Sequence, residues 1–338
     1  MFVLSKLRIV FLKSFSFVFL HTLILIENLG RVPDITFTLS VRMCLYFVVI
    51  VTAFTAFSLP AYKHSALLNP SFIESSPLAS AVLADSKVLG ASTSSVKPFP
   101  EVSATSVYVF DLAANTSIYE KNSTLSLPPA STTKLITALV SLDLYNLDDS
   151  LAVPTECTQV AGQRVGFLSE EVLTVKDLLY GLLLVSGGDA ACTLATGTTT
   201  YDEFISLMNA KAQHLHLDKT HLTNPIGLDA LDNTHVSSAY DLSIISREVL
   251  KNEFLQNVVA TSHYTSVSNS HSRLFENTNI LLQTQPGTTG IKTGRTDAAG
   301  EVLSYRYTLQ NKDYLIVVMQ SGDRFGDTLK ILNWLLLE

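Results

Sequence analysis

Two apolar runs lie in the first 62 residues and make this the most hydrophobic part of the chain. The first, 14–26, is short for a transmembrane helix, which needs about 20 apolar residues. The second, 43–59, extends to residue 61 and is the better candidate. The pattern predicts that residues 1–62 hold a membrane anchor or a signal segment, with the best span at 43–61.

The orientation of these runs stays open. If both cross the membrane from a cytoplasmic N-terminus, the rest of the chain returns to the cytoplasm. If only 43–61 crosses, with Arg31 and Arg42 before it, the rest is exported. A true start near Met43, with residues 1–42 a mis-assigned start, removes the conflict. The run is followed by no small-x-small cleavage site, which favours a retained anchor over a cleaved signal.

Beyond residue 62 the pattern changes twice. Residues 63–100 are rich in Ser, Ala and Pro, which predicts a flexible linker. Residues 101–338 have the regular apolar spacing of a globular domain. The spacing predicts strands at 106–112, 118–121, 301–309 and 314–320, and helices at 131–145, 175–185, 190–197, 201–215, 239–251 and 328–338. Strands at both ends with helices between them indicate an α/β fold with a mainly antiparallel sheet.

Charge and cysteine content narrow the function classes. The chain has 23 Lys and Arg against 30 Asp and Glu, and without a basic cluster it is not expected to bind nucleic acid. Three cysteines cannot form a disulfide framework. At most Cys157 pairs with Cys192, and we expect two buried free thiols instead. The His-x-His-x-Asp pattern at 214–218 has apolar residues interleaved, so we interpret it as solvated surface and expect no metal.

Ser131 and Lys134 stand at the start of a predicted helix. Pro128 and Pro129 precede them and cannot lie deep inside a helix, so Ser131 falls in the first turn, where free N–H groups favour developing negative charge. Residues three apart share a helix face, which brings the amine within reach of the hydroxyl. The apolar run 135–140 implies burial, which lowers a lysine pKa and makes a neutral base. Alone, S-x-x-K is more typical of a capping serine and a surface lysine, because about one such match is expected by chance in a chain of this composition.

Two further motifs follow. Ser186-Gly187-Gly188 ends a predicted apolar helix, and alone it is typical of a helix C-cap and turn. Lys292-Thr293-Gly294 offers a charge and a hydroxyl to an anionic ligand, and its glycine permits close backbone approach; the alternative is a strand that enters a turn. In this order and at these separations, the three motifs together are specific.

With these motifs, residues 101–338 resemble the low-molecular-weight penicillin-binding proteins, the serine-type D-alanyl-D-alanine carboxypeptidases. The resemblance extends to the segments 129–134, 173–181, 224–229, 238–242, 277–279 and 290–300. It implies that 101–338 is a catalytic domain of the β-lactamase/transpeptidase-like fold, with an antiparallel sheet flanked by helices and a helical subdomain. The segments outside the three motifs are expected to maintain the fold.

The resemblance also implies a role for each motif. Ser131 would attack the carbonyl between the two terminal D-alanines of a peptidoglycan stem pentapeptide and form an acyl-enzyme. Lys134 would take the serine proton, and Ser186 would relay a proton to the leaving amine. The Lys-Thr-Gly segment would bind the terminal carboxylate, with Arg324 as a weaker helper. The backbone N–H groups of Ser131 and Arg295 would form the oxyanion hole.

The same resemblance implies binding partners and a cellular location. Peptidoglycan stem peptides would be substrates and β-lactam antibiotics covalent inhibitors, and no metal or organic cofactor is needed. The catalytic domain would act at the outer face of the bacterial cytoplasmic membrane, anchored through the N-terminal segment, or secreted if that segment is cleaved.

One position departs from the family pattern. Gly188 stands where the family's Ser-x-Asn motif has asparagine, whose amide contacts the substrate backbone and the lysine. Losing one such contact costs roughly 2–4 kcal/mol. A non-catalytic protein that binds stem peptides or penicillin therefore stays an alternative, as does a D,D-endopeptidase with the same residues. A class A β-lactamase would need a glutamate for deacylation, and the nearest similar segment, at Glu253, lies closer to Lys292 than to Ser186.

Overall fold

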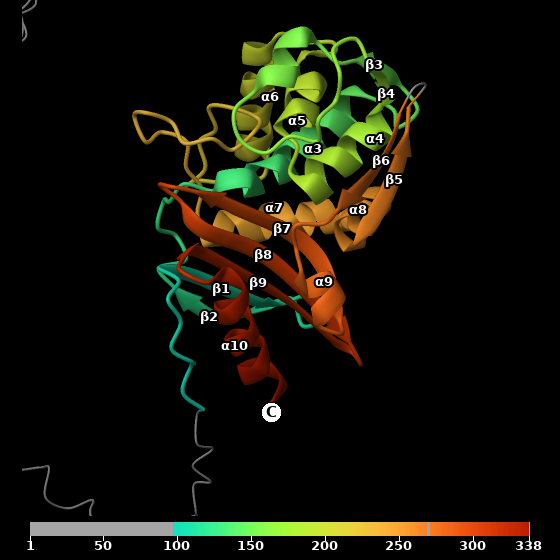
Figure 1. Cartoon of the computed structure of the whole chain (residues 1–338). Helices are drawn as coiled ribbons and strands as arrows, with labels where there is room; N and C mark the ends of the chain where they lie inside the picture. The colour runs from blue at the N-terminus through green and yellow to red at the C-terminus, as the bar shows by residue number, and fades with distance from the viewer. Residues whose placement is uncertain (1–96, 269–270, 338) are drawn as a thin grey trace, which may run out of the picture. The chain divides into compact units, whose positions relative to one another are not determined.

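The computed structural model describes residues 97–268 and 271–337, so the predicted membrane span and most of the predicted linker lie outside the described residues. A five-stranded antiparallel sheet has the strand order β2-β1-β9-β8-β7. Its strands come from the two ends of the described chain: β1 (Ser106–Asp111), β2 (Thr116–Lys121), β7 (Thr288–Thr296), β8 (Gly300–Leu309) and β9 (Lys312–Ser321). Strand β7 forms one edge of the sheet (Figure 1).

Both faces of the central strands are covered, because alternate side chains enter two different cores. Val107 and Val109 of β1 pack with the last helix, α10 (Arg324–Leu336), whereas Tyr108 and Phe110 face the larger helical part. Figure 1 shows α10 on one side of the sheet and α7 (Ala239–Lys251) on the other. This burial explains why the strands have nearly continuous apolar sequences.

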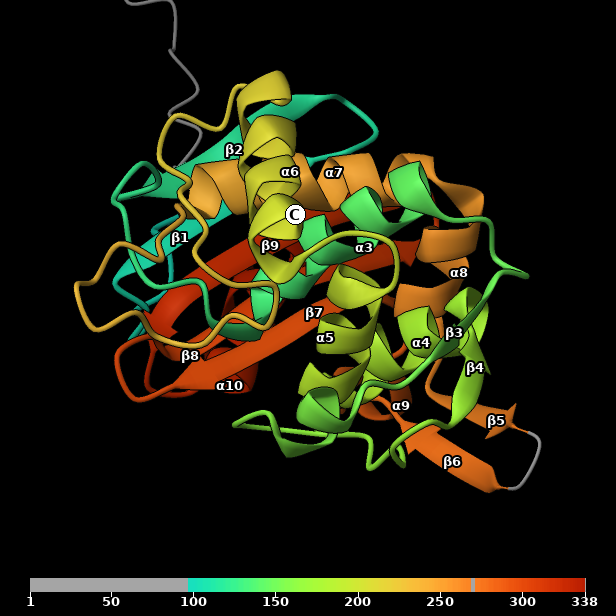
Figure 2. The same ribbon diagram turned by 90° about the horizontal axis from the view of Figure 1, so that it is seen from above.

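The segment between the strands folds into a helical part that covers the face of the sheet opposite α10 (Figure 2). Its longer helices are α3 (Lys134–Leu144), α4 (Val175–Tyr180), α5 (Gly188–Thr196), α6 (Tyr201–His214) and α8 (Glu253–Ala260). Short helical turns are η1 (Ala130–Thr133), η2 (Thr155–Gln159), η3 (Gly181–Val185) and α9 (Leu281–Thr284). The helical part packs on β1 and β9 through α7, and on β7 through α8 and the short turn η1. Two small hairpins pair β3 (Ser150–Ala152) with β4 (Val172–Thr174), and β5 (His263–Val267) with β6 (Ser272–Glu276).

The α/β class, the antiparallel sheet and the flanking helices are confirmed, with local differences. The predicted helix 131–145 begins as the 3₁₀ turn η1, and the predicted helix 175–185 continues as the π-helical turn η3. The last helix starts at Arg324 rather than at residue 328, because the Asp323 side chain accepts the N–H of Gly326 and caps it. Helix α8 and the β5–β6 hairpin were not predicted, because both are short: α8 has 8 residues and each strand has 5.

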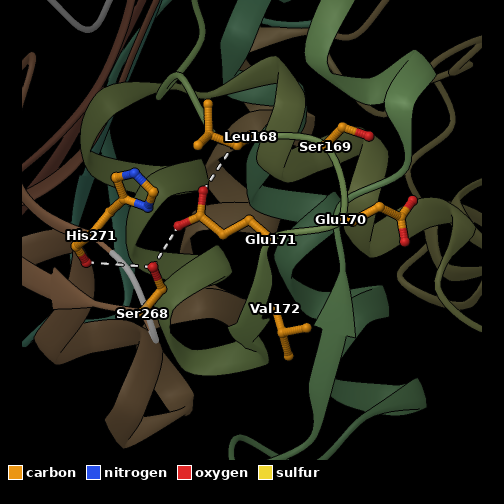
Figure 3. A pocket seen from close by; sticks show the side chains of 7 residues that line it. All are labelled: Leu168, Ser169, Glu170, Glu171, Val172, Ser268 and His271. Atoms are coloured by element: carbon orange, nitrogen blue, oxygen red, sulfur yellow. Dashed lines mark hydrogen bonds between the residues drawn. The ribbon is translucent and has the colours of Figure 1, made fainter.

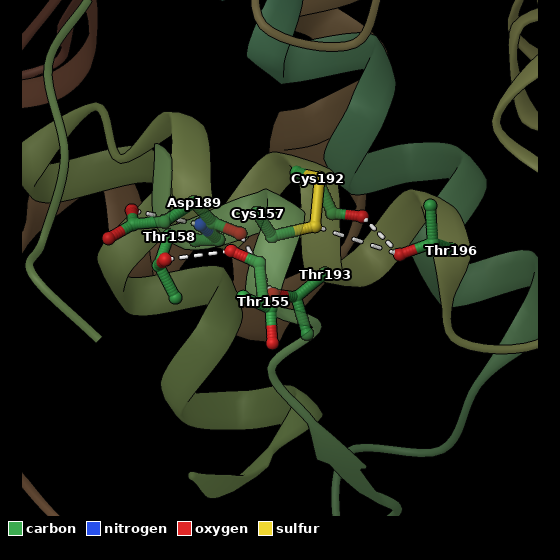
Figure 4. The surroundings of a disulfide bond; sticks show 8 residues. Thr155, Cys157, Thr158, Asp189, Cys192, Thr193 and Thr196 are labelled. Atoms are coloured by element: carbon green, nitrogen blue, oxygen red, sulfur yellow. Dashed lines mark hydrogen bonds between the residues drawn. A yellow bond between two sulfur atoms is a disulfide. The ribbon is translucent and has the colours of Figure 1, made fainter. Parts of the chain in front are cut away.

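The prediction of two free thiols is wrong, because Cys157 and Cys192 form a disulfide (Figure 4). The bond joins η2 to α5, two elements whose packing brings residues 35 positions apart together. Both cysteines are buried, as expected. Sequence spacing alone carries no signal for such a tertiary contact.

Within the part of the chain that the structure describes, no helix is both long enough and apolar enough to cross a membrane. The predicted span at 43–61 falls outside that part, so it stays a prediction.

Candidate active site

Ser131 and Lys134 meet at the junction of η1 and α3. Lys134 Nζ lies 3.1 Å from Ser131 Oγ, as the three-residue spacing predicts. Ser131 is partly exposed, whereas only 1% of the Lys134 side chain is exposed. The pair therefore combines an accessible hydroxyl with a buried amine.

Burial lowers the pKa of Lys134 to about 7, and the nearby Asp189 carboxylate opposes the shift. A substantial fraction of the amine is therefore neutral at neutral pH. A neutral amine at hydrogen-bond distance from a hydroxyl is the geometry that general-base activation of a serine requires.

Ser186 ends η3 in the left-handed conformation, with φ at 67°. Its hydroxyl is buried and has no hydrogen-bond partner among the described residues. The carbonyl of Leu184, two residues earlier, accepts the N–H of Thr278, whose own side chain bonds Thr293. Ser186 is thus tied to the β7 motif through its neighbours, and its free hydroxyl is available to a ligand.

Strand β7 carries the third motif along the edge of the sheet. Lys292 is 1% exposed and donates to the carbonyl of Thr293, and the Thr293 hydroxyl lies 2.6 Å from that of Thr278. Burial, with further contributions from the charges of Lys134 and Arg324, holds the pKa of Lys292 well below its usual value. A site of this kind favours an anion, which restores the charged form of the lysine.

Gly294 brings β7 against η1. A Cβ atom on Gly294 would lie 2.9 Å from Ala130 Cβ and 3.0 Å from the backbone N of Ser131, so only glycine fits here. Arg324 lies behind the strand and donates to the Gly294 carbonyl at 3.0 Å. The Arg295 side chain points to solvent and is 75% exposed. The structure thus assembles Ser131 and the Lys-Thr-Gly segment, with Arg324 as a support for β7.

Gly188 lies at the start of α5, under the segment 160–167. Its N–H donates to the Gln163 carbonyl at 2.7 Å, and a Cβ there would meet Val160 Cγ2 at 3.1 Å. The next residue, Asp189, is fully buried and accepts N–H groups of the same segment, from Val165, Gly166 and Phe167. Sequence reasoning missed this anchoring role of Asp189.

Two other missed groups lie beside Lys134. Its Nζ also donates to the backbone carbonyl of Ile226, at 2.5 Å. His235 is buried, with Nε2 2.9 Å from the hydroxyl of Thr133. The sequence flagged the segment around Ile226 only as a fold element, since a backbone carbonyl has no residue signature.

The other predictions have simpler outcomes. His214, His216 and Asp218 are exposed, as expected, and residues 97–268 and 271–337 hold no group of three or more potential metal-ligand side chains. A cavity of about 260 Å³ lies between the segment 168–172 and the β5–β6 hairpin, with Glu171 bonded to Ser268 (Figure 3). None of the predicted catalytic residues lines it.

Comparison with known proteins agrees with this geometry. Residues 91–323 match the D-alanyl-D-alanine carboxypeptidase family model. The D-alanyl-D-alanine carboxypeptidase DacB2 of Mycobacterium tuberculosis is 37% identical over 202 residues, which cover 60% of this chain and 69% of that protein. The D-alanyl-D-alanine endopeptidase of Escherichia coli is 33% identical, covering 70% of this chain and 78% of that protein.

The fold agrees as well. The crystal structure of a D-alanyl-D-alanine carboxypeptidase from Mycobacterium tuberculosis superimposes with a TM-score of 0.68 at 31% identity, covering 72% of this chain and 95% of that one. With its buried lysine beside the motif serine and a family match over most of its length, the chain belongs to the D-alanyl-D-alanine carboxypeptidase family of serine peptidases.

Proposed function

We propose that this protein is a serine D-alanyl-D-alanine carboxypeptidase that removes the terminal D-alanine from peptidoglycan stem pentapeptides. The observation that carries the proposal is the distance of 3.1 Å between Ser131 Oγ and the buried amine of Lys134. Lys134 in its neutral form takes the Ser131 proton as Oγ bonds to the carbonyl carbon between the two D-alanines. Backbone N–H groups of Ser131 and Arg295 stabilise the oxyanion.

Collapse of this intermediate breaks the carbon–nitrogen bond. The leaving amine takes a proton through the Ser186 hydroxyl, which is buried and unpartnered among the described residues. Departure of D-alanine leaves an ester on Ser131. Water then attacks the ester: its oxygen bonds to the acyl carbon, one of its protons passes to Ser131 Oγ, and the shortened stem peptide is released. β-Lactams acylate the same hydroxyl and act as covalent inhibitors.

The terminal carboxylate of the substrate binds at Lys292 and Thr293. Both side chains are nearly fully buried, and a carboxylate supplies the negative charge that their pocket lacks. Arg324, which supports the Gly294 carbonyl, adds positive charge behind them. Gly188 contributes only backbone to this site. The substrate contact that a side chain at this position would make is absent, which lowers the expected rate without removing the nucleophile or its base.

Localisation follows from the substrate. Peptidoglycan lies outside the cytoplasmic membrane, so the domain acts on the outer face. The apolar run at 43–61 would hold it there as an anchor, and the Ser-rich segment 63–100 would act as a tether.

The test offers two substrates to the full-length protein: a soluble stem pentapeptide and a cross-linked stem-peptide dimer. A carboxypeptidase releases D-alanine from the first, and Ser131→Ala abolishes the release. Cleavage of the dimer alone would assign a D,D-endopeptidase, the activity named for one of the relatives. Stable acylation by penicillin with no product from either substrate would assign a non-catalytic binding protein.

A further inference from the structure

The side chain of Asn224 organises a tight loop beside the catalytic lysine. Its Oδ1 accepts three successive backbone N–H groups, those of Ile226 at 3.1 Å, Gly227 at 2.7 Å and Leu228 at 3.0 Å. Its Nδ2 donates to the carbonyl of Leu228 at 3.0 Å. One asparagine therefore satisfies four backbone groups and fixes the direction of the peptides at 224–228.

Three consecutive residues of this loop contact the helix that carries Ser131 and Lys134. The carbonyl of Pro225 accepts the Thr137 hydroxyl at 2.8 Å, and that of Ile226 accepts Lys134 Nζ at 2.5 Å. Gly227 has φ at +85°, and a Cβ there would lie 2.0 Å from the Ala130 carbonyl oxygen. The loop is therefore pressed against the turn that presents the nucleophile.

The Ile226 carbonyl has a chemical consequence for Lys134. A neutral amine has two N–H groups and one lone pair, and a carbonyl can only accept a hydrogen bond. When the Ile226 carbonyl accepts a hydrogen bond from one of these N–H groups, rotation of the amine is restricted. The lone pair of Nζ is then free to receive the proton of Ser131 Oγ, which lies 3.1 Å from Nζ. Gly188, whose Cβ position is 3.4 Å from Ile226 Cγ2, offers no side-chain acceptor for this task.

We propose that Asn224 is a positioning residue for catalysis: it holds the Ile226 carbonyl against Lys134, so that the lone pair of the amine faces Ser131. The inference rests on the proposed use of Ser131 as nucleophile and Lys134 as base. In this protein the 224–228 loop supplies the contact that orients Lys134, because glycine at position 188 has no side chain to make it.

Asn209 provides a matched control. It also bridges backbone groups, since its Oδ1 accepts the N–H of Leu222 at 2.9 Å and its Nδ2 donates to the carbonyls of Leu222 and Ile205. None of these groups touches Lys134. Asn209→Ala should therefore lose the stability that a bridging asparagine contributes, but it should keep the acylation rate of wild type.

The experiment measures the rate of Ser131 acylation by a fluorescent penicillin, from about pH 6 to about pH 10, in the full-length wild type, Asn224→Ala and Asn209→Ala. Asn224→Ala should acylate about 10- to 100-fold more slowly at pH 7, as for a misplaced catalytic group. Its rate should recover partly at high pH, because a loosened loop admits water and raises the pKa of Lys134. Asn209→Ala should keep the wild-type pH profile, even if it melts at a lower temperature.

Asn224→Asp tests the cause, because it keeps an oxygen acceptor for the three N–H groups. At pH 10, where Lys134 is neutral and the added charge matters least, Asn224→Asp should acylate within a few-fold of wild type. A rate about 10-fold or more below wild type at this pH would overturn the inference, and so would an Asn224→Ala variant with the wild-type profile. An acylation rate of Asn224→Ala that is reduced by the same factor at every pH would show that Asn224 has a purely structural role. If Asn224→Ala does not fold, the Asn224→Asp comparison decides alone. Wild type that is acylated but releases no D-alanine contradicts the proposed function only, whereas wild type that is not acylated contradicts both.

Discussion

Lys134 and Lys292 are two buried lysines in one site, and the charge of the first lowers the pKa of the second. Each side chain is 1% exposed, and the charge of Lys134 is, after burial, the next cause that lowers the pKa of Lys292. Two buried cations are costly together unless an anion joins them. A substrate carboxylate at Lys292 fills this need and leaves Lys134 free to stay neutral as the base.

Acylation should therefore rise with pH as Lys134 loses its proton. Since burial lowers the pKa of this lysine to about 7, the rate should reach half its maximum near that pH. Stopped-flow acylation by a β-lactam gives the profile. Lys134→Arg keeps the charge but cannot lose its proton, and should reduce acylation by about 10⁴-fold or more. A rate that does not change from about pH 5 to about pH 9 would exclude Lys134 as the base.

Lys292→Ala should lower kcat/KM for the pentapeptide by about 10- to 100-fold, the value of a charge-assisted hydrogen bond. The same substitution should have little effect on a substrate whose terminal carboxylate is replaced by an amide. Lys176→Ala, at an exposed position, is the control and should match wild type on both substrates. An equal loss on the two substrates would show that Lys292 does not bind the carboxylate.

Replacing Gly188 with asparagine should not increase activity. The new Cβ would lie 3.1 Å from Val160 Cγ2 and 3.2 Å from the Gln163 carbonyl oxygen, so the segment 160–167 must shift to admit the side chain. Such overpacking costs about 1–3 kcal/mol. The melting temperature and the rate of D-alanine release should both be lower in Gly188→Asn than in wild type. The decrease should be smaller in Gly188→Ala. A several-fold gain in release would show that the site keeps room for the family's asparagine.

These residues also show what the sequence can predict. Ser131 and Lys134 were predictable because three residues on a helix set their distance. The β1, β8 and β9 strands were predictable from their apolar spacing. The Ile226 carbonyl was not, since it contacts a lysine 92 positions away through its backbone. The Cys157–Cys192 bond was missed for the same reason, because it depends on how η2 packs against α5.

The disulfide should stabilise the helical part of the domain. It closes a loop between residues 35 positions apart, which corresponds to about 3–4 kcal/mol in a chain-entropy estimate. The double variant Cys157→Ser with Cys192→Ser should therefore unfold at lower urea concentration. A dithiol reductant should lower the stability of wild type and leave that of the variant unchanged. Equal urea midpoints for wild type and variant would contradict this contribution.

His235 should make the fold sensitive to acid. Its Nδ1 accepts the N–H of Thr223 at 3.0 Å, so the neutral ring carries its proton on Nε2 and donates to Thr133. Burial lowers the pKa of His235 from 6.5 to about 4. The folded protein thus binds fewer protons than the unfolded chain between these pH values, and stability is lost as the pH falls through them, by up to about 3 kcal/mol.

Urea unfolding of wild type and His235→Ala from about pH 7 to about pH 4.5 measures this effect. The variant should be less stable at neutral pH, because Thr133 and the N–H of Thr223 lose their partner. Its stability should then fall less steeply with acid than that of wild type. Parallel curves for the two proteins would assign the acid sensitivity to other groups.

The most direct test of the account asks where a β-lactam attaches. The full-length protein is incubated with penicillin, its intact mass is measured, and the modified peptide is sequenced. One adduct on Ser131, lost in Ser131→Ala and strongly slowed in Lys134→Arg, is the predicted result. An adduct on another residue, or none on the folded wild type, would contradict the assignment of Ser131 and Lys134 as nucleophile and base.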